Sequence, residues 1–212
     1  MRRCAPFALS IGRAAGVSAV IALLGNAIVL LGRRWNAADW TTLVGVPLLG
    51  ASGSLLLRLR GWRWGDLGWR RPTVAARRAV PCSLLGAAPV AAAMSAIVWS
   101  ERTGDVTVLN VVRLVVGTAV GEEIVHRGVV LATWLSTGAS ARAIFVANLT
   151  TFALWHVAGA ADKGPAGVVV DVGGPAVLGV VLLWARLRYR SVSASAAFHG
   201  AGNLGGSAIV GR

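Results

Sequence analysis

Long apolar runs separated by short polar clusters dominate the sequence. Seven such runs lie at about 14–31, 40–57, 79–99, 106–135, 141–160, 167–184 (or from 173) and 191–210. An α-helix of about 20 apolar residues crosses a hydrocarbon core of about 30 Å. The pattern therefore predicts an all-α, polytopic integral membrane bundle of about seven transmembrane helices. We expect residues 1–212 to form a single membrane domain.

The composition agrees with this interpretation. Hydrophobic residues make up 56% of the chain and charged residues 14%, and the mean hydropathy is +0.68. A soluble domain carries roughly 25% charged residues, so an ordinary soluble domain is excluded. The first apolar run is longer than the core of a cleaved signal peptide, which has about 7–15 residues. We therefore expect that run to be retained in a multi-pass protein of the cell membrane.

The formal net charge of +13 raises nucleic-acid binding as an alternative. The arginines, however, lie mainly between the apolar runs. Fourteen of them fall in loops on the side of the N-terminus, against five cations on the other side. Because cytoplasmic loops are enriched in Lys and Arg, this asymmetry predicts a cytoplasmic N-terminus, an external C-terminus and no nucleic-acid partner.

The most polar segment is 58–78, in which seven arginines surround Trp62, Trp64 and Trp69. Its Gly and Pro residues argue against a spanning helix. Trp and Arg together are typical of the interface between a bilayer and water. We interpret the segment as a solvated loop at the membrane surface, with a specific lipid or partner site as the alternative.

The fourth apolar run contains an unusual group of charges at 121–128. Charged residues inside such a run cost a few kcal/mol each on insertion scales, so they usually have a partner or a function. Residues four apart share a helix face, which pairs Glu123 with Arg127 and places His126 one turn after Glu122. The first pair can neutralise itself, and Glu122 is left available as a general base. The alternative is that the whole group is an ion-pair lock between helices.

Three further polar residues lie in later runs. His156 follows Phe152 by four residues, and His199 and Asn203 share a face one turn apart. Together with Glu122 they would suit water activation, in which a carboxylate acts as base, an imidazole holds the water and His and Asn donors stabilise an oxyanion. Glu122, His156 and His199 would also suit a Zn²⁺ ion with an open coordination position.

These residues form three motifs in a fixed order: Glu122-Glu123-x-x-x-Arg127, Phe152-x-x-x-His156 and His199-x-x-x-Asn203. The motifs resemble those of the CPBP family of intramembrane endopeptidases, the CAAX protease and bacteriocin-processing (Abi) group. The resemblance covers about 107–205, which places the expected catalytic core and active site in the C-terminal half. The stretch 62–71 also resembles the loop that precedes the core in this family.

The resemblance implies a peptidase that hydrolyses a peptide bond of a membrane-associated protein or peptide with glutamate-activated water. It assigns water activation to Glu122 with help from His156, oxyanion stabilisation to His199 and Asn203, and support of the site to Glu123 and Arg127. This mechanism requires no cofactor, although the family has been called metalloprotease and a zinc ion is compatible with it. The expected partners are the lipid bilayer and the peptide or protein substrate.

His126 departs from the family pattern, which commonly has an apolar aromatic residue before the motif arginine. It could act on Glu122, serve as a ligand or merely face a neighbouring helix. Two other functions stay open from the sequence. One is a non-catalytic membrane scaffold or immunity protein that retains the core. The other is a small proton-coupled transporter, for which the expected internal repeats are not found in the sequence.

Overall fold

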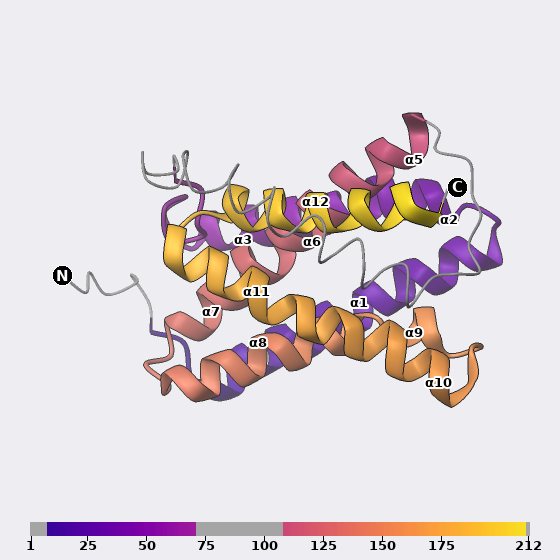
Figure 1. The fold of residues 1–212 in the computed structure, drawn as a ribbon. Helices are drawn as coiled ribbons and strands as arrows, with labels where there is room; N and C mark the ends of the chain where they lie inside the picture. Colours follow the sequence, from indigo (N-terminus) through magenta and orange to yellow (C-terminus); the bar gives the residue numbers. More distant parts are fainter. Residues whose placement is uncertain (1–7, 71–107, 211–212) are drawn as a thin grey trace.

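The computed structural model describes residues 8–70 and 108–210, and every regular element in these two ranges is a helix (Figure 1). The predicted third span at 79–99 lies outside the described residues. Each of the other predicted spans coincides with helical backbone. The prediction of an all-α fold is confirmed for the described ranges.

The first two spans form neighbouring helices. Helix α1 (Ile11–Arg34) begins after Ser10, whose Oγ accepts the Arg13 N–H at 3.3 Å, an ordinary N-cap. The second span joins α2 (Ala38–Trp40), the π-helical segment η1 (Thr41–Gly45) and α3 (Val46–Leu59). Pro47 lies in the first turn of α3. Proline has no N–H to donate to the hydrogen-bond ladder of a helix. We attribute the π-type hydrogen bonding of η1, which immediately precedes Pro47, to this missing donor.

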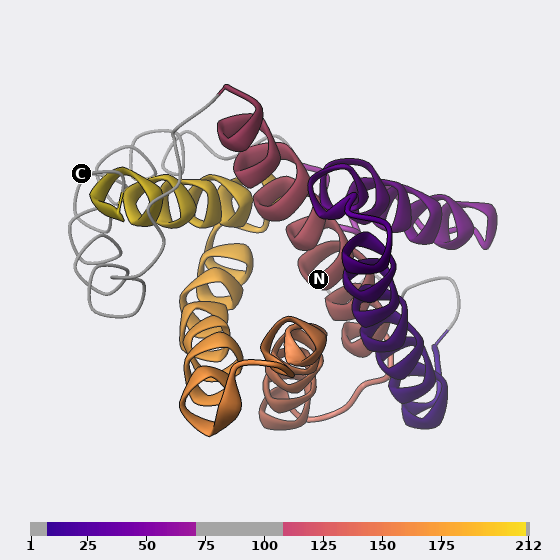
Figure 2. The ribbon, with the colours of Figure 1, turned by 90° about the vertical axis from the view of Figure 1, so that its right-hand side faces the viewer.

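The fourth predicted span forms the central helix of the molecule. It runs without a break through α5 (Val108–Val112), η2 (Arg113–Val120), α6 (Gly121–Glu123), η3 (Ile124–Val130) and α7 (Leu131–Leu135). This central helix packs against α3 on one side and against α12 (Val192–Val210) on the other (Figure 2). A Cβ atom on Gly117 would lie 2.8 Å from Leu43 Cα, and one on Gly121 would lie 2.9 Å from Val46 Cγ1. Glycine at these two positions therefore permits the close approach of the second span.

The fifth predicted span is interrupted. Helix α8 (Ala141–Trp155) ends at Trp155, His156 caps it, and α9 (Val157–Ala160) begins at the next residue. Asn26 of α1 bridges the interruption, since its Nδ2 donates to Leu154 O at 2.8 Å and its Oδ1 accepts the Ala158 N–H at 2.6 Å. The backbone groups freed by the interruption thus find partners inside the bundle, as membrane proteins require.

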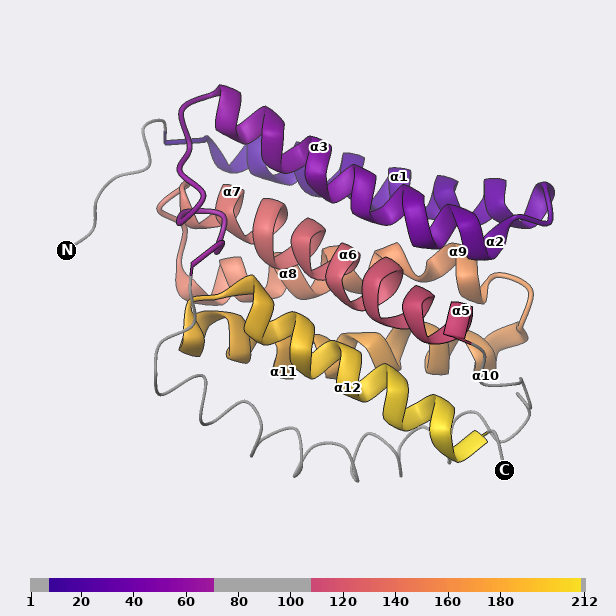
Figure 3. The same cartoon turned by 90° about the horizontal axis from the view of Figure 1, so that it is seen from above.

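The sixth predicted span is the continuous helical run of α10 (Gly164–Val168), η4 (Val169–Gly173) and α11 (Gly174–Tyr189). Arg190 adopts a left-handed conformation with φ of 55° and connects α11 to α12. Figure 3 shows this connection at the same end of the bundle as the end of α3 and the segment α7. The end of α11 and the end of α3 therefore lie at the same end of the bundle (Figure 3).

The exposed surface has the character expected for contact with lipid. Three of the described helices, at Ile11–Arg34, Thr41–Leu59 and Gly164–Tyr189, are long and apolar enough to cross a membrane. Leu23 and Leu59 are 70% and 75% exposed, whereas Glu123 and Arg127 are fully buried. The chain is a helical membrane protein, and the total of seven spans stays a prediction.

The segment at 62–70 differs from its interpretation as a solvated loop. Trp62 and Leu67 are buried in the bundle. The Gly68 carbonyl accepts the Val192 N–H at 3.0 Å, and the Arg70 carbonyl accepts the Ser191 hydroxyl at 3.2 Å. The interpretation is wrong for this part, because the apolar side chains and backbone of the loop dock on the start of α12. Residues 71–78 of the predicted loop lie outside the described residues.

Candidate active site

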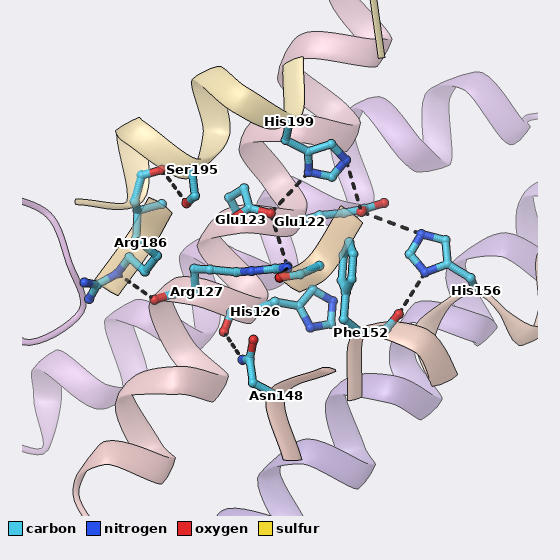
Figure 4. Close-up of polar contacts among 12 residues, drawn as sticks. Glu122, Glu123, His126, Arg127, Asn148, Phe152, His156, Arg186, Ser195 and His199 are labelled. Atoms are coloured by element: carbon cyan, nitrogen blue, oxygen red, sulfur yellow. Dashed lines mark hydrogen bonds and ion pairs between the residues drawn. The ribbon is translucent and has the colours of Figure 1, made fainter. Parts of the chain in front are cut away.

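The two glutamates of the first motif form the centre of a polar cluster inside the bundle. Both lie on α6, in the middle of the central helix, and both are buried. Three helices supply the side chains around them: the central helix itself, α8 with its interrupted end, and α12 (Figure 4). The sequence motifs, which are far apart in the chain, thus meet at one place.

Glu123 is held by two nitrogen groups. Its Oε1 lies 3.2 Å from Arg127 Nη1 and 3.2 Å from His199 Nδ1. Arg127 also donates from Nη2 to the Gly179 carbonyl of α11 at 3.2 Å. The predicted pair of Glu123 and Arg127 is therefore present, and it joins the central helix to α11 and α12.

Glu122 faces two imidazoles at a longer distance. Its Oε2 lies 3.8 Å from His156 Nε2 and 4.0 Å from His199 Nε2 (Figure 4). Neither distance is that of a direct hydrogen bond. The structure thus brings Glu122, His156 and His199 together, with a gap of this size between the carboxylate and each ring.

Each imidazole is oriented through its other nitrogen. His156 Nδ1 donates to the Phe152 carbonyl at 2.8 Å, which explains the four-residue spacing of the second motif. His199 Nδ1 contacts the Glu123 carboxylate at 3.2 Å. In the resulting tautomer of neutral His156, Nε2 carries a lone pair directed at the Glu122 side of the cluster.

Phe152 fills the space between these groups. Its ring is almost fully buried and makes edge-type contacts with His156 and His199 at centroid distances of 5.0 and 6.1 Å. The Arg127 guanidinium carbon lies 4.2 Å from the ring centroid, a cation–π arrangement. Phe152 therefore restricts the positions of both imidazoles and of the supporting arginine.

Asn203 contacts a different part of the central helix. Its Nδ2 donates to the Leu114 carbonyl at 3.2 Å. Leu114 lies in η2, about two turns before Glu122. The structure thus places the predicted Asn203 on the same helix as His199 and fastens its amide group to the central helix.

His126 lies beside Phe152 and below the two glutamates in the view of Figure 4. Its ring is fully buried and makes edge contacts with Phe152 at 4.9 Å and with Trp155 at 5.1 Å. Among the described residues neither ring nitrogen has a hydrogen-bond partner. The side chain of Asn148 instead donates to the His126 backbone carbonyl at 2.9 Å. Of the roles considered for His126, this arrangement favours packing against a neighbouring helix.

Two polar residues that contact the motif residues, Asn148 and Arg186, were not singled out from the sequence. Neither was Asn26, which bridges the α8–α9 interruption. Arg186 was assigned to a charged loop, and that assignment is wrong, since it is buried within α11 and its Nε donates to the Arg127 carbonyl at 3.1 Å. A Cβ atom on Gly68, which has φ of +85°, would lie 2.4 Å from Arg186 Nη2. Arg186 therefore connects the 62–70 loop to the helix that carries the glutamates. The available signal was a polar residue inside or beside an apolar run.

The residues proposed as zinc ligands are of types that zinc accepts. In the two described ranges, however, no group of three His, Cys, Asp or Glu side chains is close enough to hold a metal ion. A zinc ion held by Glu122, His156 and His199 therefore stays a prediction from the sequence, and we derive no step through one.

One family model matches a range in the C-terminal half of the chain. Residues 104–205 match the model described as type II CAAX prenyl endopeptidase Rce1-like. The matched range contains the three motifs and the buried cluster, and the resemblance to the CAAX protease group is confirmed. No curated protein and no solved structure matches the chain.

Proposed function

We propose that the chain hydrolyses a peptide bond of a membrane-associated protein or peptide by glutamate-activated water. Residues 104–205 match the Rce1-like family model of type II CAAX prenyl endopeptidases, and this match supports an intramembrane endopeptidase. The single observation that carries the mechanism is the position of Glu122. Its buried carboxylate faces the Nε2 atoms of His156 and His199 at 3.8 and 4.0 Å. A water oxygen can contact the carboxylate and an imidazole at this spacing.

In the proposed reaction Glu122 is the general base. The carboxylate removes a proton from the water while His156, whose Nδ1–H is held by the Phe152 carbonyl, accepts the other water proton in a hydrogen bond at Nε2. The hydroxide attacks the scissile carbonyl carbon and forms a tetrahedral intermediate. Glu122 then returns its proton to the leaving nitrogen, and the C–N bond breaks to give a carboxylic acid and an amine.

His199 is the proposed donor to the oxyanion. It contacts the Glu123 carboxylate through Nδ1, and this contact holds the ring with Nε2 on the side of Glu122. Asn203 is the proposed second donor, and its amide group is held at the central helix by the hydrogen bond from Nδ2 to the Leu114 carbonyl. Glu123 and Arg127 serve as the support that holds His199 in place.

The assignment of Glu122 is tested by Glu122→Gln in purified protein with a short membrane-anchored peptide as substrate. Loss of a general base lowers turnover by about 10²–10⁴-fold, and we expect the fold to be retained because the amide has nearly the same shape. Asp162→Asn is the matched control, since it makes the same change at an exposed carboxylate paired with Arg33 at 3.2 Å. Unchanged turnover in Glu122→Gln would remove Glu122 from the role of base. A wild-type protein that cleaves no peptide would favour the non-catalytic scaffold.

Metal removal tests the proposed absence of a metal step. We expect full activity after treatment with a chelator, with the metal content checked by elemental analysis of the same sample. Activity that disappears on chelation and returns with Zn²⁺ alone would contradict the metal-free mechanism. It would point instead to a rearranged site in which Glu122, His156 and His199 act as ligands.

A further inference from the structure

A cavity of about 1060 Å³ lies at the end of the bundle where α1 begins and α3 ends. Its lining comes from the start of α1, the end of α3, the following loop and Thr133 of α7. None of the residues proposed for catalysis lines it. The volume is slightly above the range of about 300–1,000 Å³ that is usual for small-molecule sites. The cavity is therefore large enough for a ligand, and it lies apart from the glutamate cluster.

The lining combines cationic and apolar groups. Arg13 and Arg60 contribute guanidinium groups from two different elements, while Leu9, Val17 and Leu57 contribute apolar surface. No lining residue is acidic. Both arginines are exposed, and no carboxylate among the described residues pairs with either. The cavity thus offers two cations beside a hydrocarbon surface, which is complementary to an anionic amphiphile.

Two charged residues near the cavity, Arg58 and Asp66, have partners of their own. Arg58 is engaged elsewhere, because its Nη1 donates to the Trp62 carbonyl and its guanidinium carbon lies 5.3 Å from the Trp64 ring centroid. The nearby Asp66 accepts the Arg63 backbone N–H at 2.9 Å. Arg13 and Arg60 are thus left as the groups that can bind a ligand anion in the cavity.

The position of the cavity relative to the membrane indicates that its ligand is a lipid. It lies at the ends of two helices, Ile11–Arg34 and Thr41–Leu59, that are long and apolar enough to cross a bilayer. The ends of such helices lie at the depth of the lipid headgroups, where anionic lipids attract basic residues. A lipid in the same bilayer can therefore place its phosphate at the arginines and its acyl chain along the leucines.

We propose that this cavity binds one anionic phospholipid, with the headgroup phosphate at Arg13 and Arg60 and an acyl chain against Leu57 and Val17. The test uses the purified full chain exposed to equal amounts of phosphatidylglycerol and phosphatidylcholine with identical acyl chains. Bound lipid is counted by native mass spectrometry. The experiment needs no peptidase activity, so its result is independent of the proposed reaction.

We expect the wild type to retain phosphatidylglycerol over phosphatidylcholine by about tenfold or more, given two arginines at the surface of the bilayer. Arg13→Gln with Arg60→Gln should abolish this preference. Arg142→Gln with Arg188→Gln is the matched control, since it removes the same charge from exposed positions that do not line the cavity. The control pair should retain the preference.

Three results would overturn the proposal. One is equal retention of the two lipids by the wild type. Another is an equal loss of preference in the control pair, which would show general attraction to a basic surface. The third is displacement of the lipid by inorganic phosphate at the same concentration, which would reduce the site to a binding site for free anions.

Discussion

Glu122 and Glu123 are adjacent in sequence but differ in their contacts. Glu123 has Arg127 and His199 at 3.2 Å each, whereas the nearest nitrogen groups to Glu122 are at 3.8 and 4.0 Å. Removing one member of a buried ion pair leaves the other charge uncompensated, at a cost of about 3–5 kcal/mol. The two carboxylates should therefore differ in what they contribute to stability.

We predict that Glu123→Gln lowers the free energy of unfolding by about 3–5 kcal/mol because Arg127 is then buried without its anion. Glu122→Gln should have a much smaller effect, since the two imidazoles that face Glu122 are farther away, at 3.8 and 4.0 Å. The measurement is thermal unfolding of both variants in the same detergent. Equal losses of stability would contradict this division between a supporting and a reacting carboxylate.

Helical spacing was sufficient to predict the pairing of Glu123 with Arg127, because both residues lie on one helix and the geometry is local. It could not show that His199 also contacts Glu123, since the two residues are 76 positions apart. It also left the direction of His126 open. The packing of Phe152 and Trp155 from another helix decides that direction, and local spacing contains no information about it.

At the scale of elements, the apolar runs predicted the helices of the described ranges to within a few residues. The run at 141–160 was predicted as one span, yet the helix is interrupted at His156. The interruption depends on Asn26, which is 132 positions from its partner Ala158. The sequence signal for this contact was the amide side chain of Asn26 inside the first apolar run.

The docking of the 62–70 loop also depends on contacts between residues that are far apart in the sequence. Its Trp and Arg content indicated an interfacial segment, and Trp64 and Trp69 are indeed exposed. The buried side of the loop depends on Leu67 and Gly68, and the latter leaves room for the Arg186 guanidinium. The loop therefore reaches the central helix through Arg186 and the Arg127 carbonyl. Composition alone does not distinguish this arrangement from a loop in solvent.

At the scale of the whole molecule, the distribution of polar and apolar groups is the reverse of that in a soluble protein. Ionisable and amide side chains gather around α6, while large apolar side chains cover the outside of α1, α3 and α11. A buried polar cluster in such a bundle can hold water where the surrounding lipid excludes it. Peptide hydrolysis at membrane depth requires water at the active site, and a buried polar cluster surrounded by an apolar exterior provides a place for it.

The charges at the two ends of the bundle lead to a prediction of orientation. In the described ranges, one end carries arginines including Arg60 and Arg142, whereas the other carries Arg33 and Lys163 in ion pairs with Asp162 and Asp171. Because Lys and Arg are enriched in cytoplasmic loops and most of the loop arginines lie on the side of the N-terminus, the loop before α8 should be cytoplasmic and the loop after α9 external.

This orientation is tested with Ala141→Cys and Ala161→Cys, two exposed positions at opposite ends of the α8–α9 unit. Both native cysteines, Cys4 and Cys82, are replaced by alanine in each variant. A membrane-impermeant maleimide added to intact cells should label Ala161→Cys, and Ala141→Cys should react only after the cells are opened. The reverse pattern would invert the orientation. It would also move the lipid cavity at the start of α1 to the external leaflet, without changing the chemistry proposed for either site.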